Sequence, residues 1–110
     1  MKESEALDRI FHALSDSTRR ELLAQLSSSE STVTELAEPF KMTLAAVSKH
    51  IRVLEAAGFV KREVDGRIHR CKADLAPLQN ASQFIEKYRR HWEKQFDMMD
   101  NYFKKPKKLR

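Results

Sequence analysis

The segment from 43 to 58 constrains the fold most strongly, because it carries the start, the period and the end of one amphipathic helix. The Thr43 hydroxyl can cap the first turn, and Gly58 lies where a left-handed residue commonly follows the last turn. Apolar side chains at about 100° per residue fall within one narrow arc, and they are Leu44, Val47, Ile51 and Leu54. Alanines and cations occupy the opposite side. The sequence therefore predicts a helix that packs by one face and exposes the other.

The residues before this helix predict a second, shorter one. Thr32 and Glu35 have the spacing of a capping box, in which a hydroxyl and a carboxylate each accept a hydrogen bond from a free amide. The short helix should cover 33–40, and Pro39, which has no N–H group, should end or distort it. A short helix, a turn of a few residues and a longer helix with an exposed polar face predict a helix-turn-helix at about 32–57.

After Gly58 the hydrophobic period changes from 3.6 towards 2, which is typical of strands. Residues 59–64 and 67–71 predict the two arms of a hairpin. Asp65-Gly66 between them is a favoured pair for a two-residue type I′ turn. Because both arms and the tip carry basic residues, the hairpin over 59–72 is interpreted as a wing.

Apolar residues at helical spacing predict helices at both ends of the chain. The first covers 4–14, and a second begins at Ser15 or Asp16, either of which can cap it. The SSSES segment at 27–31 is expected to be a polar loop. A long last helix is expected over about 79–103, with aromatic residues at steps of three or four.

These elements predict one domain over residues 1–103, mainly α with a small β-hairpin and with the architecture of a winged helix-turn-helix. The KKPKKLR tail at 104–110 is expected to be disordered.

Charge is unevenly distributed along the chain. The net charge is +5, and residues 41–72 alone hold eight basic and three acidic side chains. The tail at 104–110 adds five basic side chains and no acidic ones, so the remainder is acidic. Positive charge gathered in one segment is typical of a nucleic-acid-binding face.

The composition excludes several classes of protein. No stretch approaches the roughly 18 apolar residues of a transmembrane helix, and no secretory signal is recognisable, so we expect a cytoplasmic protein. Cys71 is the single cysteine, which excludes an intramolecular disulfide. The two glycines are assigned to a helix end and a turn, and no nucleophile elbow is present. We therefore expect no enzyme activity and no cofactor.

Three motifs in order carry a family resemblance: LSDSTRRELLAQL, TVTELAEPFKMTLAAVSKHIRVLEAAGFV and KREVDGRIHRCK. Over roughly 5–103 the chain resembles the ArsR (arsenic-repressor) family of winged helix-turn-helix transcriptional regulators. The resemblance implies a homodimeric DNA-binding protein, usually a repressor, that dimerises through its first and last helices. It also implies that 43–56 is the recognition helix and 60–72 the wing. Ser17 departs from the proline that is common there.

The known metal-ligand motifs of the family are missing. Sensors of the cysteine type carry Cys-Val-Cys-Asp-Leu where this chain has TVTEL at 32–36, and threonine hydroxyls do not replace thiolates for a soft ion. Sensors of the last-helix type use an Asp-x-His pair followed by His-x-x-Glu or His-x-x-His, whereas His91 here is followed by Lys94. His69 and Cys71 alternate onto one face of a wing strand. A two-ligand site there, or redox sensing by Cys71, is a weaker reading than a structural role, and no metal site is predicted.

The recognition helix and the wing supply the candidate DNA-binding residues. Small residues allow close approach to bases, and arginine and lysine can reach guanine or phosphate. The full set is Thr43, Ala45, Ala46, Ser48, Lys49, His50, Arg52, Arg67 and Arg70. For His50, structural hydrogen bonding is an equal alternative. For Arg67 and Arg70 the alternative is charge that protects a strand edge.

A last helix of about 25 residues is longer than the rest of the body can cover, so its apolar stripe is expected to meet a second subunit. The candidate dimer residues are Leu7, Ile10, Phe11, Tyr88, Trp92, Phe96, Met99 and Phe103.

The sequence thus predicts a homodimeric repressor that covers a promoter at an inverted-repeat operator in double-stranded DNA. The alternative is a winged-helix protein-interaction module with only weak, non-specific DNA binding. A further alternative adds an unidentified small-molecule inducer to the DNA-binding protein.

Overall fold

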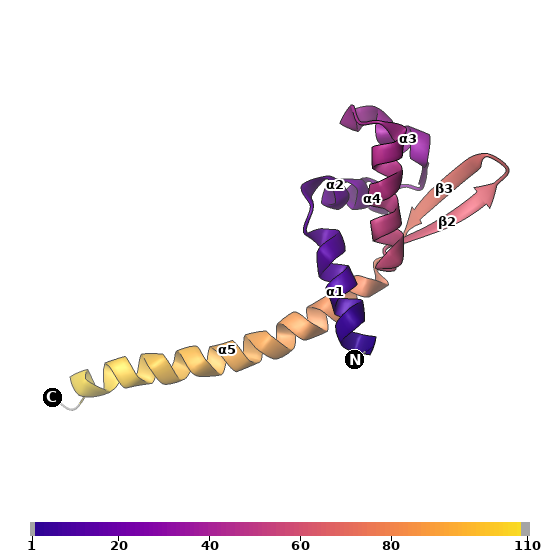
Figure 1. Ribbon diagram of the computed structural model, residues 1–110. Helices are drawn as coiled ribbons and strands as arrows, with labels where there is room; N and C mark the ends of the chain where they lie inside the picture. The colour runs from indigo at the N-terminus through magenta and orange to yellow at the C-terminus, as the bar shows by residue number, and fades with distance from the viewer. Residues whose placement is uncertain (1, 109–110) are drawn as a thin grey trace.

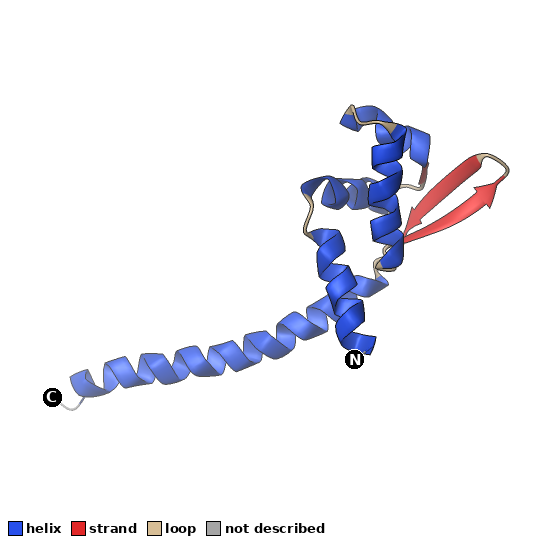
Figure 2. Cartoon of the chain, in the orientation of Figure 1, coloured by secondary structure: helices blue, strands red, loops and turns tan. Residues whose placement is uncertain are grey.

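The computed structural model describes residues 2–108, with side chains described from residue 4 to residue 103. Five α-helices and three short strands follow one another along the chain (Figures 1 and 2). The elements are α1 Lys2–Leu14, α2 Ser17–Ser28, β1 Ser31–Thr32, α3 Val33–Ala37, a 3₁₀ helix Glu38–Phe40, α4 Leu44–Ala56, β2 Val60–Asp65, β3 Ile68–Ala73 and α5 Ala76–Lys108. The expected class, mainly α with a small β-hairpin, is confirmed.

Side-chain caps begin the helices where the sequence predicts. Asp16 caps α2 by accepting a hydrogen bond from a backbone N–H. Thr32 and Glu35 form the predicted capping box at α3, with the Glu35 N–H donating to Thr32 Oγ1 at 3.2 Å and the Thr32 N–H donating to Glu35 Oε1 at 2.9 Å. Thr43 caps α4, since its Oγ1 accepts from the Ala46 N–H at 3.1 Å.

The turn between α3 and α4 follows from two residues. Pro39 lies in the 3₁₀ helix at Glu38–Phe40, where a missing N–H group is tolerated, and it distorts the helix as predicted. Lys41 then adopts a left-handed conformation with φ of 52°, which ends the helical path and lets the chain turn into α4.

The wing is an antiparallel hairpin of β2 and β3, but its turn differs from the prediction. Asp65 pairs with Ile68, so the two central residues are Gly66 and Arg67 rather than Asp65 and Gly66. Gly66 has φ of 63° while Arg67 does not have a positive φ. A type I′ turn needs positive φ at both central residues, so the type I′ prediction is wrong. Arg67 is consequently a turn residue.

A third strand was missed in the polar segment at 27–31. Helix α2 continues to Ser28, and Ser31–Thr32 forms β1, which pairs with Cys71 and Arg70 of β3. The sheet order is β1-β3-β2. β1 therefore ties the start of the helix-turn-helix to the base of the wing.

The core lies where α1, α2, α3, α4 and the base of the wing meet. Phe59, which follows the left-handed Gly58, is fully buried and links α4 to β2. Ile10 is only 2% exposed within a single chain, so it belongs to the subunit core. Its assignment to the dimer interface is therefore wrong, because α1 turns this part of its apolar stripe inwards.

Helix α5 is longer than predicted. It begins at Ala76 and runs 33 residues to Lys108, a length of about 50 Å. Figure 1 shows it leaving the body beside α1 and extending far beyond it. The helical backbone includes 104–108, for which disorder was expected, whereas 109–110 lie outside the described residues. Within the described chain, no helix is long and apolar enough to cross a membrane.

Candidate nucleic-acid interface

Helix α4 has the two faces that the sequence predicts. Val47, Ile51 and Leu54 are fully buried against the core, whereas Lys49 and Arg52 are exposed. Leu44 differs from the expectation: it is half exposed and faces the wing instead of the core. Helix α4 therefore packs by its middle and last turns and offers its first turns and cationic side to a partner.

The predicted DNA-binding residues divide by exposure. Those exposed to solvent are Thr43, Ala45, Lys49, Arg52, Arg67 and Arg70, and those partly buried are Ala46, Ser48 and His50. In the part of the chain that the structure describes, Lys49, Arg52 and Arg67 make no ion pair, so their charges are available to an anion.

A groove separates the first turns of α4 from the wing. Its volume is about 280 Å³, and its walls come from β1, α3, α4, β2, β3 and the wing turn. Its lining residues are Thr32, Val33, Thr34, Leu44, Ser48, Arg62, Arg67, Ile68 and His69. Two predicted residues, Ser48 and Arg67, are thus brought to one groove. Hydroxyls and guanidinium groups of this kind suit phosphate oxygens.

The groove also includes Thr34, which no sequence motif marks as a functional residue. Thr34 is exposed at the start of α3, and its side chain lines the groove. Arg70 lies outside the groove lining. It assists in lowering the pKa of Glu35, which is lowered mainly by hydrogen bonds from the Thr32 backbone and side chain.

An arginine in β2 fastens the wing to α4. Arg62 Nη2 donates to Glu55 Oε1 at 2.7 Å and Arg62 Nε donates to Glu55 Oε2 at 3.2 Å, a two-pronged contact with the last turn of α4. Its Nη1 lies 3.1 Å from His69 Nδ1 of β3. Arginine offers only donors, so the His69 Nδ1 atom accepts. Arg62 therefore holds both strands of the wing against α4, a role that spacing in the sequence does not reveal.

His50 forms a hydrogen bond with a buried arginine of the same chain. Its Nδ1 atom lies 3.2 Å from Nη1 of Arg19, a residue of α2 that is 8% exposed. Arg19 was not predicted as a functional residue. The structural alternative for His50 therefore has a specific partner, while its Nε2 atom is not used in that bond.

Cys71, a residue of β3, is fully buried. Burial raises the pKa of its thiol, with Arg62 opposing the shift, and a raised pKa disfavours the thiolate that redox sensing would need. Among the residues described, no three His, Cys, Asp or Glu side chains gather at a distance suited to a metal ion.

The predicted dimer residues of α5 form an exposed apolar stripe. Ile85, which is not among the residues predicted from the sequence, lies on it too. We call it the α5 stripe, and its members are Ile85, Tyr88, Trp92, Phe96, Met99 and Phe103, which are 46–64% exposed. Near the body, Phe84 contacts Phe11 of α1 with ring centroids 5.6 Å apart and Tyr88 at 4.6 Å. On α1, Leu7 is partly buried and Phe11 is 38% exposed. The stripe therefore continues from the α1–α5 contact along the free part of α5.

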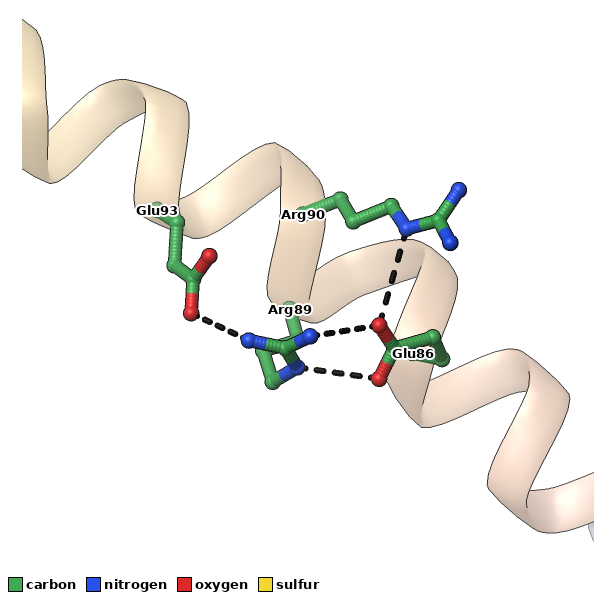
Figure 3. Close-up of polar contacts among 4 residues, drawn as sticks. All are labelled: Glu86, Arg89, Arg90 and Glu93. Atoms are coloured by element: carbon green, nitrogen blue, oxygen red, sulfur yellow. Dashed lines mark hydrogen bonds and ion pairs between the residues drawn. The ribbon is translucent and has the colours of Figure 1, made fainter.

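Ion pairs occupy another part of the α5 surface. Arg89 lies between Glu86 and Glu93 and bonds both, and Arg90 reaches Glu86 at 3.5 Å (Figure 3). The hydrogen bonds that Arg89 donates are the main reason that the pKa of Glu86 lies below its usual range, and the charges of Arg89 and Arg90 lower it further. Pairs at these spacings support a helix without tertiary contacts.

A helix-turn-helix followed by a basic hairpin defines a winged helix-turn-helix, a class of DNA-binding module. Residues 14–63 match a family model described as a helix-turn-helix domain. An uncharacterised HTH-type transcriptional regulator of Bacillus subtilis, YuzN, is 39% identical over 80 residues, which are 66% of this chain and 87% of that protein. The Bacillus subtilis transcriptional repressor SdpR is 27% identical over 79 residues, 72% of this chain and 88% of its own.

Among solved structures, an ArsR family transcriptional regulator is 38% identical with a TM-score of 0.78, over 82% of this chain and 93% of that one. The chain belongs to the ArsR family of helix-turn-helix transcriptional regulators. It is accordingly a DNA-binding regulator, in a class of proteins that are not enzymes.

Proposed function

We propose that the protein is a cytoplasmic homodimeric repressor that occupies an inverted-repeat operator and thereby blocks a promoter. The observation that carries this proposal is that Lys49 and Arg52 of α4 are exposed and make no ion pair with the residues that the structure describes, while Arg67 lines the neighbouring groove. A helix with this face can enter the major groove, where arginine and lysine bond guanine O6 and N7.

The wing supplies the second half of the proposed contact. Arg67 at its turn would reach the adjacent minor groove or the phosphates beside it, and Ser48 and Thr34 would hold a phosphate of the same strand. Because Arg62 fastens the wing to α4, both contacts would form together.

The α5 stripe supports the homodimer. An apolar helix face of this length is costly in water, and a second copy of the chain presents the same face. Two-fold symmetry would then place two recognition helices on one side of the DNA, about one helical turn apart. The operator should consequently be an inverted repeat. SdpR, a repressor, supports the direction of the regulation.

The first experiment is selection of genomic fragments by the purified protein at near-physiological salt, with the bound sequences read out. We expect enrichment of one inverted repeat. Uniform recovery that disappears as salt is added would mean that the basic face attracts DNA only by charge, and would favour the protein-interaction module instead.

Variants then test the recognition face. Lys49→Ala and Arg52→Ala should each weaken operator binding by about 1–3 kcal/mol if they contact bases. Lys94→Ala is the matched control, because it removes one exposed positive charge from α5 instead of α4. Unchanged operator affinity in both α4 variants would refute the assignment of this face.

The dimer is tested separately with Trp92→Ala. Losing a large aromatic side chain from an interface should shift the protein towards monomer in analytical ultracentrifugation. A Trp92→Ala protein that stays dimeric at nanomolar concentration would remove Trp92 from the interface.

A further inference from the structure

Arg19 is the charged residue that the described fold buries most deeply, and it joins three helices. It lies in the first turn of α2 and is 8% exposed. Its Nε donates to the Ala13 carbonyl and its Nη2 to the His12 carbonyl, each at 2.9 Å. These carbonyls belong to the last turn of α1, where helix geometry leaves them without a partner inside the helix. The His12 carbonyl also accepts from the N–H and the hydroxyl of Ser15. Arg19 therefore caps the end of α1 and holds its own guanidinium in one orientation.

The third nitrogen of the Arg19 guanidinium reaches α4. Arg19 Nη1 lies 3.2 Å from His50 Nδ1. Since a guanidinium has no acceptor, His50 is held with Nδ1 unprotonated and the proton on Nε2. The contact thus links the C-terminal end of α1, through α2, to one defined atom of α4.

The position of His50 along α4 gives this bond a consequence for DNA binding. His50 follows Lys49 directly and precedes Arg52 by two residues, so any roll of α4 that displaces His50 displaces both cations. The buried face of α4 consists of Val47, Ile51 and Leu54, and apolar contacts are not directional. A hydrogen bond is directional, and it loses strength steeply as its angle falls.

We propose that Arg19 and His50 are positioning residues that set the orientation of α4 relative to α1. This inference rests on the proposed function. In a dimer that joins through α1 and α5, the orientation of α4 on α1 sets the separation of the two recognition helices. His50 then acts on operator binding through Arg19, and its Nε2 atom makes no contact with DNA.

Two substitutions of His50 separate this role from a direct contact. In His50→Asn, the amide oxygen stands near the position of Nδ1 and can still accept from Arg19. In His50→Gln, the longer side chain carries its amide to the position of Nε2 and leaves the Nδ1 position empty. Both variants are uncharged, and the site is only partly buried, so both should fold. Should His50→Gln not fold, His50→Leu provides the same contrast with His50→Asn.

The affinity of each protein is measured on the selected operator and on two altered operators whose half-sites are one base pair closer or farther apart. We expect His50→Asn to match the wild type within about three-fold. We expect His50→Gln to bind the selected operator about ten-fold more weakly, which corresponds to the loss of one charge-assisted hydrogen bond. It should also discriminate less between the three spacings, a change that lower stability alone does not produce.

Several results would overturn the inference. Weak binding by His50→Asn with normal binding by His50→Gln would show that Nε2 contacts DNA. Equal affinities for the two variants, whether normal or reduced, would show that the acceptor at Nδ1 does not position α4. A wild-type protein that selects no operator would overturn the proposed function itself, and this inference with it, before any variant is compared.

Discussion

The contact between Glu55 and Arg62 should stabilise the wing measurably. The two side chains are 29% and 18% exposed, so solvent screens their charges only in part. Exposed ion pairs contribute about 0.2–1 kcal/mol, whereas breaking a fully buried pair costs about 3–5 kcal/mol. With two hydrogen bonds and intermediate exposure, Arg62→Gln should lower the free energy of unfolding by about 2 kcal/mol.

Denaturant unfolding of the wild type, Arg62→Gln, Glu55→Gln and the double variant measures this pair by a double-mutant cycle. We expect a coupling energy of about 1–2 kcal/mol. The control is Arg89→Gln on α5, where the arginine also bonds a glutamate through two nitrogens but the two side chains are more exposed, at 52% and 42%. The change in the free energy of unfolding should be much smaller for this control than for Arg62→Gln.

Additive effects of Arg62→Gln and Glu55→Gln, within about 0.5 kcal/mol, would refute the reasoning, because neighbouring residues that interact do not behave independently. The Arg62→Gln protein should also bind its operator more weakly, because the bonds that fasten the wing to α4 are lost.

Three further predictions concern stability and reactivity. Cys71 should react with a thiol reagent only at the rate of unfolding, because it is buried and its pKa is raised; rapid labelling of the native protein would contradict this. Phe59→Ala should cost about 3–5 kcal/mol in denaturant unfolding, since it empties a fully buried site; a cost below about 1 kcal/mol would mean that the core closes over it. Hydrogen bonds from the backbone lower the pKa values of Asp16 and Glu35 in the folded state. Their stabilisation is therefore present at neutral pH and is lost as the pH falls below about 4 towards the folded pKa values, and Asp16→Asn should flatten the acid side of a stability–pH curve.

Much of the helix-turn-helix could be predicted because its signals are local. The caps at Thr32 and Thr43 and the left-handed Gly58 each act within a few residues, and the period of α4 is set by neighbours in sequence. The class of fold followed from the order of these elements.

The features that were missed depend on partners distant in the chain. Arg19 bonds carbonyls of another helix, and any residue type supplies a carbonyl, so no spacing marks that contact. β1 has two residues, too few to show a period. Ile10 lies on the same apolar stripe as the accessible residues of α1, and only the packing of α2 and α4 decides which of them face inwards.

Trp92 provides an intrinsic fluorescence signal that reports on the surroundings of α5. It is the only tryptophan in the sequence, and it lies in the α5 stripe with more than half of its surface in water. Indole emission moves to shorter wavelength when water leaves the ring, so whatever covers α5 should be seen in the fluorescence of the unlabelled protein. A dilution series would then follow assembly directly, and the same cuvette could follow the response of α5 when DNA occupies α4 at the other end of the molecule.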